Sequence, residues 1–81
     1  MRISNCPICG LSWSEPIDEE EVRCSYWICE CCGCEYGYDD NPTYRKNWLK
    51  QGAPWFDPKQ RPTSWNLEEQ LRHIIPDWNA R

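Results

Sequence analysis

The sequence predicts a small α+β domain stapled by a metal: a zinc ribbon with two metal-binding turns and short β-hairpins, followed by two α-helices. Only 12 of the 81 residues are Leu, Ile, Val or Phe, yet the chain holds six Trp, four Tyr and seven Cys. A domain of this size gains little stability from its core alone, so a staple is expected. Its length leaves room for one structural domain.

The cysteine count favours a metal over disulfides as this staple. Seven is an odd number, so a framework of disulfides alone would leave one thiol over. The N-terminus also lacks the apolar stretch of a secretory signal, which predicts a reducing, cytoplasmic location. Metal binding is therefore the better interpretation.

The spacing of the cysteines selects four ligands. Cys6-Pro7-Ile8-Cys9-Gly10 is a CxxCG turn, and Cys29-Glu30-Cys31-Cys32-Gly33 has the same spacing. Two intervening residues let one tight turn direct two sulfurs at a single tetrahedral centre. We predict one structural Zn²⁺ because four thiolates leave no open position; the spacing leaves iron, as in rubredoxin, as an alternative. The predicted metal ligands are Cys6, Cys9, Cys29 and Cys32.

The first half of the chain, 1–41, is predicted to form the ribbon. Residues 11–21 read as a polar loop that ends in an acidic run. Apolar and polar residues then alternate over 22–28, which predicts a strand, and residues 34–38 form the returning strand. On this interpretation one face of the first strand carries Val22, Cys24, Tyr26 and Ile28.

The second half, 42–81, is predicted to be a helical, aromatic- and Pro-rich tail that packs back on the ribbon. Asn41 can cap a first helix and Gly52 can end it. Residues 53–64 show no periodicity and contain three prolines, and a second helix is expected after Asn66. In the first helix we expect Tyr44, Trp48 and Leu49 on one side, with Arg45, Lys46 and Lys50 in solvent.

Charge is divided unevenly along the chain. Residues 1–41 hold nine acidic and two basic side chains, whereas residues 42–81 hold four acidic and seven basic ones. The isoelectric point near 4.8 disfavours nucleic acid as a partner, because phosphate neutralisation dominates that affinity. A nucleic-acid-binding zinc-ribbon regulator stays as the alternative, with a patch near Trp55 and Trp65 built from Arg45, Lys46, Lys50, Lys59, Arg61 and Arg72.

The sequence offers little for catalysis. A four-cysteine site leaves no coordination position for water, and His73 is the only histidine that could serve as a base. Of the three spare thiols, Cys24, Cys31 and Cys34, the last two lie among acidic residues that disfavour thiolates, so redox chemistry ranks low. Cys24 and Cys34 are expected to fill the inner face of the hairpin formed by residues 22–28 and 34–38. We expect no enzyme, and no apolar run approaches the roughly 18 residues of a membrane span.

Several further blocks accompany the two CxxCG turns: Tyr26-Trp27-Ile28, Cys34 to Asp40, Tyr44 to Trp48, Gly52 to Phe56, Trp65, and Glu69 to Leu71. Together they resemble a group of small, mostly uncharacterised bacterial zinc-ribbon proteins related to the cysteine-rich CPCC family. Such relatives usually have proline where Glu30 stands and an aromatic residue where Cys34 stands. The resemblance implies a cytosolic bacterial module, with a role in conflict systems or as an adaptor.

Protein binding is the function that this combination favours. Aromatic side chains supply many interface anchors, and an acidic rim suits a basic partner. We predict a non-catalytic protein-binding module: an immunity or inhibitor protein, or a regulatory adaptor, acting on a basic toxin or enzyme. Trp48 and Trp78 are expected in the core. The predicted partner-binding residues are Trp27, Trp55, Trp65, Asp39 and Asp40.

Overall fold

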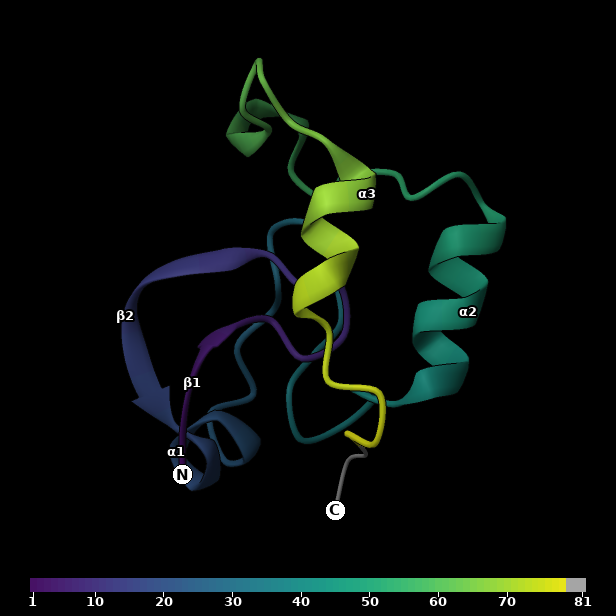
Figure 1. The fold of residues 1–81 in the computed structure, drawn as a ribbon. Helices are drawn as coiled ribbons and strands as arrows, with labels where there is room; N and C mark the ends of the chain where they lie inside the picture. The colour runs from purple at the N-terminus through teal and green to yellow at the C-terminus, as the bar shows by residue number, and fades with distance from the viewer. Residues whose placement is uncertain (79–81) are drawn as a thin grey trace.

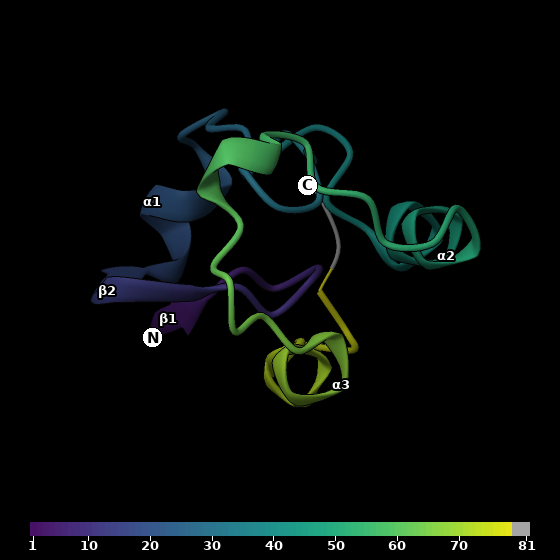
Figure 2. The ribbon, with the colours of Figure 1, turned by 90° about the horizontal axis from the view of Figure 1, so that it is seen from above.

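A computed structural model describes residues 1–78 of the chain. Two strands and several short helices surround two irregular loops that carry the CxxCG turns (Figure 1). The β-hairpin lies on one side of these loops and α2 on the opposite side, while α3 covers a third face (Figure 2). The elements in order are β1 Arg2–Asn5, β2 Ser12–Asp18, α1 Glu19–Arg23, α2 Pro42–Lys50, η1 Pro58–Gln60, α3 Leu67–Gln70 and η2 Leu71–His73.

The hairpin encloses the first CxxCG turn and replaces the expected loop over 11–21. Strands β1 and β2 pair antiparallel, with Ile3 opposite Ile17 and a register shift before Asn5 pairs with Ser12. Trp13 and Ile17 are half-buried on β2, while the residues between them are exposed. The prediction of a loop was wrong because this alternation, interrupted by Pro16, is too weak to stand out in the sequence.

The strand predicted over 22–28 is not present. Residues Glu19–Arg23 instead form α1, whose first turn is acidic and whose N-cap Asp18 accepts from the Glu20 backbone N–H. Acidic residues at a helix N-terminus and a capping carboxylate both favour this helix. Of the expected inner face only Val22 is buried, since Cys24, Tyr26 and Ile28 are exposed. Of the hairpin expected from residues 22–28 and 34–38, the structure shows an isolated bridge between Ile28 and Glu35.

Helix α2 confirms the prediction for residues 42–50. The Asn41 side chain accepts from the Tyr44 N–H, and Pro42 occupies the first turn. Trp48 is buried and donates its indole N–H to the Pro54 carbonyl at 2.8 Å. Two residues differ from expectation, because Leu49 is exposed and Arg45 is buried.

The second helix also begins where expected. The Asn66 side chain caps α3 by accepting from the Glu69 N–H at 3.0 Å, and the turn continues as the short helix η2. Between α2 and α3 the chain is irregular apart from η1. After η2 the chain returns to the first CxxCG turn, where the Ile75 N–H donates to the Pro7 carbonyl at 2.9 Å.

Sulfur and aromatic rings supply most of the core. Six of the seven cysteines are buried, and Trp48 and Trp78 are buried as expected. The aliphatic contribution is limited to a few side chains, among them Ile8 and Val22. Within residues 1–78, no helix is long and apolar enough to cross a membrane.

Candidate metal centre

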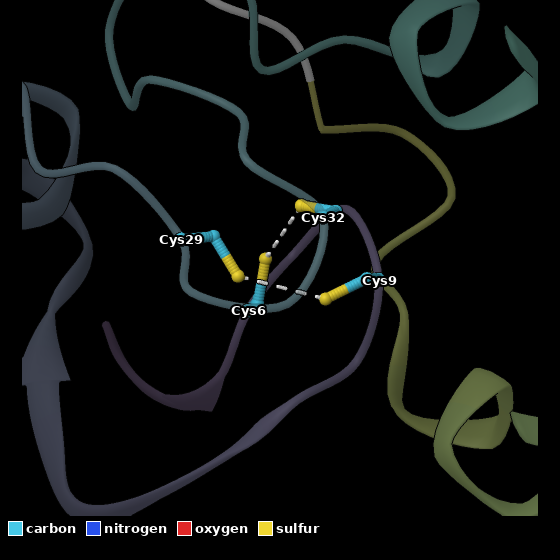
Figure 3. Close-up of side chains that lie close together, drawn as sticks. All are labelled: Cys6, Cys9, Cys29 and Cys32. Carbon is cyan, nitrogen blue, oxygen red and sulfur yellow. Dashed lines mark hydrogen bonds between the residues drawn. The ribbon is translucent and has the colours of Figure 1, made fainter. Parts of the chain in front are cut away.

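Four buried cysteine side chains converge between the two CxxCG turns. The Sγ atoms of Cys6, Cys9, Cys29 and Cys32 all lie within 4.8 Å of one another. Each turn contributes two of them, and the sulfurs point toward a common centre (Figure 3). The closest pairs join different turns, with 3.9 Å between Cys6 and Cys32 and 3.7 Å between Cys9 and Cys29.

These distances fit a tetrahedral metal ion. At a metal–sulfur distance of about 2.3 Å, two ligands of a regular tetrahedral site lie about 3.8 Å apart. A disulfide needs about 2.05 Å between its sulfurs, so the four thiols are not bonded in pairs. The structure therefore brings together the four cysteines that the spacing predicts, in an arrangement able to hold one metal ion.

A glycine closes the first turn, which we call the first knuckle (residues 6–10). Gly10 has a φ of +87° and donates its backbone N–H to the Cys6 carbonyl at 2.8 Å. A Cβ atom built on Gly10 would lie 2.0 Å from the Gln70 carbonyl oxygen. Glycine is needed here both for the left-handed backbone and for the close approach of α3.

The second knuckle (residues 29–33) repeats the arrangement. Gly33 has a φ of +78°, and its N–H donates to the Cys29 carbonyl at 2.8 Å. The Cys29 N–H in turn donates to the Cys34 carbonyl at 2.9 Å, which joins the two ends of the loop that carries this knuckle. Phe56 packs over Gly33, where a Cβ atom would lie 2.8 Å from the aromatic ring.

The second half of the chain fixes the backbone of both knuckles. Gln70 donates its amide to the Cys9 carbonyl at 3.0 Å, and the Tyr44 hydroxyl donates to the Cys32 carbonyl at 2.8 Å. The Phe56 N–H donates to the Cys31 carbonyl at 2.9 Å. Such outer contacts hold the sulfurs in position before a metal arrives.

Thiols packed this closely cannot all ionise without a cation. Hydrogen bonding with Cys29 and its neighbours raises the pKa of Cys9, and the same interaction with Cys29 raises the pKa of Cys32. Burial opposes ionisation of Cys6, but hydrogen bonds from the surrounding thiols lower its pKa overall. The raised pKa values keep Cys9 and Cys32 protonated in the metal-free cluster, so a metal ion must displace these protons when it binds.

Two of the three spare thiols lie beside the cluster and one does not. Cys31 and Cys34 are buried, and Cys31 accepts from the Gln70 amide at 3.3 Å. Neither belongs to the group of sulfurs within 4.8 Å. Cys24 is exposed, so its expected place on the inner face of a hairpin was wrong, whereas Cys34 is buried as expected.

The predicted partner-binding residues differ widely in exposure. Trp27 is 50% exposed, whereas Trp55 and Trp65 are half-buried and pack edge to face with ring centroids 5.7 Å apart. Asp40 is fully buried, and its carboxylate accepts from the Trp78 indole at 2.6 Å and from the Gly37 N–H at 2.9 Å. Asp39 is half-buried and accepts from the Glu35 N–H. Asp40 is therefore a core residue and not a contact for a partner.

Sequence reasoning missed two side chains that support the centre. Arg45 and Gln70 are both buried and both donate to carbonyls of the first knuckle. Helical spacing assigned Arg45 to solvent, because its position opposite the knuckle depends on the tertiary fold. The signal available for Gln70 was its place on the same helical side as Leu67 and Leu71, which pack against the core.

Fold and cluster together define a small α+β, cysteine-rich protein with a four-cysteine centre suited to a metal ion. The uncharacterized protein YoaQ of Bacillus subtilis (strain 168) is 28% identical to it over 79 residues, covering 72% of this chain and 67% of YoaQ. No protein-family model and no solved structure matches the chain. This weak homology assigns no activity, and membership of the CPCC family stays a prediction.

Proposed function

We propose that the four-cysteine centre binds one Zn²⁺ ion and that this ion stabilises the fold without taking part in a reaction. The observation that carries the proposal is the buried sulfur cluster with tetrahedral spacing. Four thiolates fill the coordination sphere, so water has no position from which to be activated. The metal would replace the aliphatic core that the composition lacks.

Metal analysis of the purified protein tests this proposal. We expect one zinc per chain by native mass spectrometry, and loss of near-UV circular dichroism when a chelator removes it. Iron at the same stoichiometry would support the rubredoxin-like alternative. A fold that persists unchanged without any metal would contradict a stabilising role.

We further propose that the protein is a non-catalytic protein-binding module. Three consecutive apolar residues are exposed, Tyr26 at 61%, Trp27 at 50% and Ile28 at 54%, and we call them the 26–28 strip. Trp27 and Ile28 also line a groove of about 400 Å³ between β2 and the second knuckle. Exposed aromatic residues beside a groove are typical anchors of a protein interface.

Charge indicates the kind of partner. Glu30 lines the groove, Glu15 is exposed on β2, and α1, the next element along the chain, begins with three glutamates. Acidic side chains on these elements are complementary to a basic surface and accelerate association with it. The proposed partner is therefore a basic protein, and the proposed role is that of an immunity protein, an inhibitor or a regulatory adaptor.

Binding to an identified partner tests this proposal. A partner recovered from the source cell should be purified and titrated with the wild type, Trp27→Ala and, as a matched control outside the groove, Tyr38→Ala, which removes an aromatic side chain that is 73% exposed. We expect a basic partner whose affinity falls at least about tenfold for Trp27→Ala and stays unchanged for the control. An acidic partner, or equal affinities for all three proteins, would contradict the proposal.

The same purification of a partner from the source cell distinguishes protein binding from the nucleic-acid alternative. Burial of Arg45 removes one member of the expected basic patch, although Arg61 still lies over the Trp65 ring at 6.0 Å. Nucleic acid that copurifies, with affinity falling steeply as salt rises, would support that alternative instead.

A further inference from the structure

Arg45 is a buried cation with an unusual set of partners. Its Nε donates to the Ile8 carbonyl at 2.6 Å, and one terminal nitrogen donates to the Pro7 carbonyl at 2.7 Å and the Ile75 carbonyl at 3.0 Å. Pro7 and Ile8 are the two residues between Cys6 and Cys9. The guanidinium is therefore held against the backbone of the first knuckle, in contact with the two residues that join the predicted ligands Cys6 and Cys9.

No carboxylate neutralises this charge among residues 1–78. The ion pair found in that part of the chain joins Arg23 to Glu19, and the buried Asp40 is occupied by Trp78 and Gly37. Burying a cation without a counter-charge is costly, and three neutral carbonyls compensate for only part of the lost hydration. The negative charge that balances Arg45 must come from another group nearby.

The sulfur cluster on the same knuckle can supply this charge when it holds a metal ion. Four thiolates around a divalent ion carry a net charge of about −2, and burial prevents water from screening it. Negative charge on Cys6, Cys32 and Cys9 favours the protonated form of Arg45, although burial lowers its pKa overall. The positive charge of Arg45 and the negative charge of the cluster therefore stabilise each other across the first knuckle.

We propose that Arg45 is the counter-ion of the metal–thiolate centre, so that its positive charge, and not only its hydrogen bonds, sets metal affinity. This proposal rests on the proposed metal site and adds a positioning residue to it. Arg45 acts through the first knuckle and does not ligate the metal. Its charge stabilises the form of the centre that carries the larger negative charge.

The chain offers a matched control for the hydrogen bonds alone. Gln70 is buried and donates to the Cys9 carbonyl of the same knuckle, but it is neutral. If Arg45 only held the backbone in place, losing either side chain should have similar consequences. If its charge matters, Arg45→Gln and Gln70→Met should differ, and Arg45→Lys should restore what Arg45→Gln loses.

Two measurements separate these cases. The first is zinc affinity by competition with a chelator, where outer contacts typically contribute about 10–100-fold. The second is the reduction potential of the iron-substituted protein, because ferrous and ferric centres carry net charges of about −2 and −1 and the potential responds to nearby charge. A role confined to holding the backbone would leave the potential unchanged.

We expect Arg45→Gln to lose at least about tenfold in zinc affinity and to have a lower reduction potential. Arg45→Lys should retain the wild-type potential and most of the affinity, and Gln70→Met should retain the potential. If Arg45→Gln takes up no metal while Arg45→Lys does, the need for charge is supported. Equal losses for Arg45→Gln and Arg45→Lys, or a potential that does not differ between wild type and Arg45→Gln, would overturn the proposal. A wild type that binds no metal would instead contradict the proposed function itself.

Discussion

The buried contact between Asp40 and Trp78 gives the sharpest stability prediction. Replacing Asp40 by alanine removes an acceptor for the Trp78 indole N–H at 2.6 Å and for the Gly37 N–H at 2.9 Å. Hydrogen bonds to a charged group contribute about 1.5–3 kcal/mol each, so the pair sums to about 3–6 kcal/mol. The fold no longer has to bury a carboxylate, which offsets part of this loss. We expect Asp40→Ala to lower the free energy of unfolding by about 2–4 kcal/mol.

Urea unfolding measured at a fixed excess of zinc tests this value, because the metal then contributes equally to all variants that bind zinc with the same affinity. Asp57→Ala is the control, since Asp57 caps a surface turn through one exposed bond of 3.3 Å and should cost about 1 kcal/mol or less. Two results would refute the reasoning: a loss below about 1 kcal/mol for Asp40→Ala, or unchanged stability together with loss of partner binding.

Two other changes address the centre more directly. Gly10→Ala should destabilise the protein by more than about 3 kcal/mol, because the new methyl group would meet the Gln70 carbonyl oxygen at 2.0 Å. Gly52→Ala is the control: Gly52 also has a positive φ but has open space around it, so this change should cost only about 1 kcal/mol. Equal losses for the two variants in urea unfolding would contradict this. Zinc affinity should fall steadily as the pH drops, since the raised pKa values of Cys9 and Cys32 keep these thiols protonated at every pH below them until a metal displaces the protons. Chelator competition between pH 5 and 8 measures this, and a flat profile would contradict it.

Local signals in the sequence were sufficient where short-range chemistry decides the structure. The cap at Asn41, the proline after it and the glycine two residues past its end predicted α2 correctly. The spacing of the two CxxCG turns likewise indicated which four sulfurs meet. Both features depend on residues within a few positions of each other.

The sequence was misleading where two local patterns competed. The alternation from Val22 to Ile28 has the period of a strand, but Asp18 and the glutamates after it start a helix that consumes the first two positions. Tyr26 then adopts a φ of +57° and turns the chain, so the alternation never lies on a sheet. The preference of Asp18 and the following glutamates for a helix N-terminus was therefore stronger than the strand preference of the short alternating stretch.

Long-range partners were outside the reach of the sequence. Arg45 occupies a position that helical spacing assigns to solvent, and the first knuckle buries it from 37 residues away. Asp40 likewise read as a surface carboxylate because Trp78 lies 38 residues further along the chain. Charged side chains at these positions are explained by tertiary contacts that no local pattern contains.

The most direct test of the central claim, that these four cysteines hold one metal ion, is metal content by native mass spectrometry of Cys29→Ser and Cys31→Ser beside the wild type. Cys29 belongs to the sulfur cluster, while Cys31 is an equally buried neighbour outside it. The account predicts one zinc ion for the wild type and Cys31→Ser, and a marked loss for Cys29→Ser, because one of four ligands is gone. Full zinc occupancy in Cys29→Ser together with loss in Cys31→Ser would contradict the assignment of the centre.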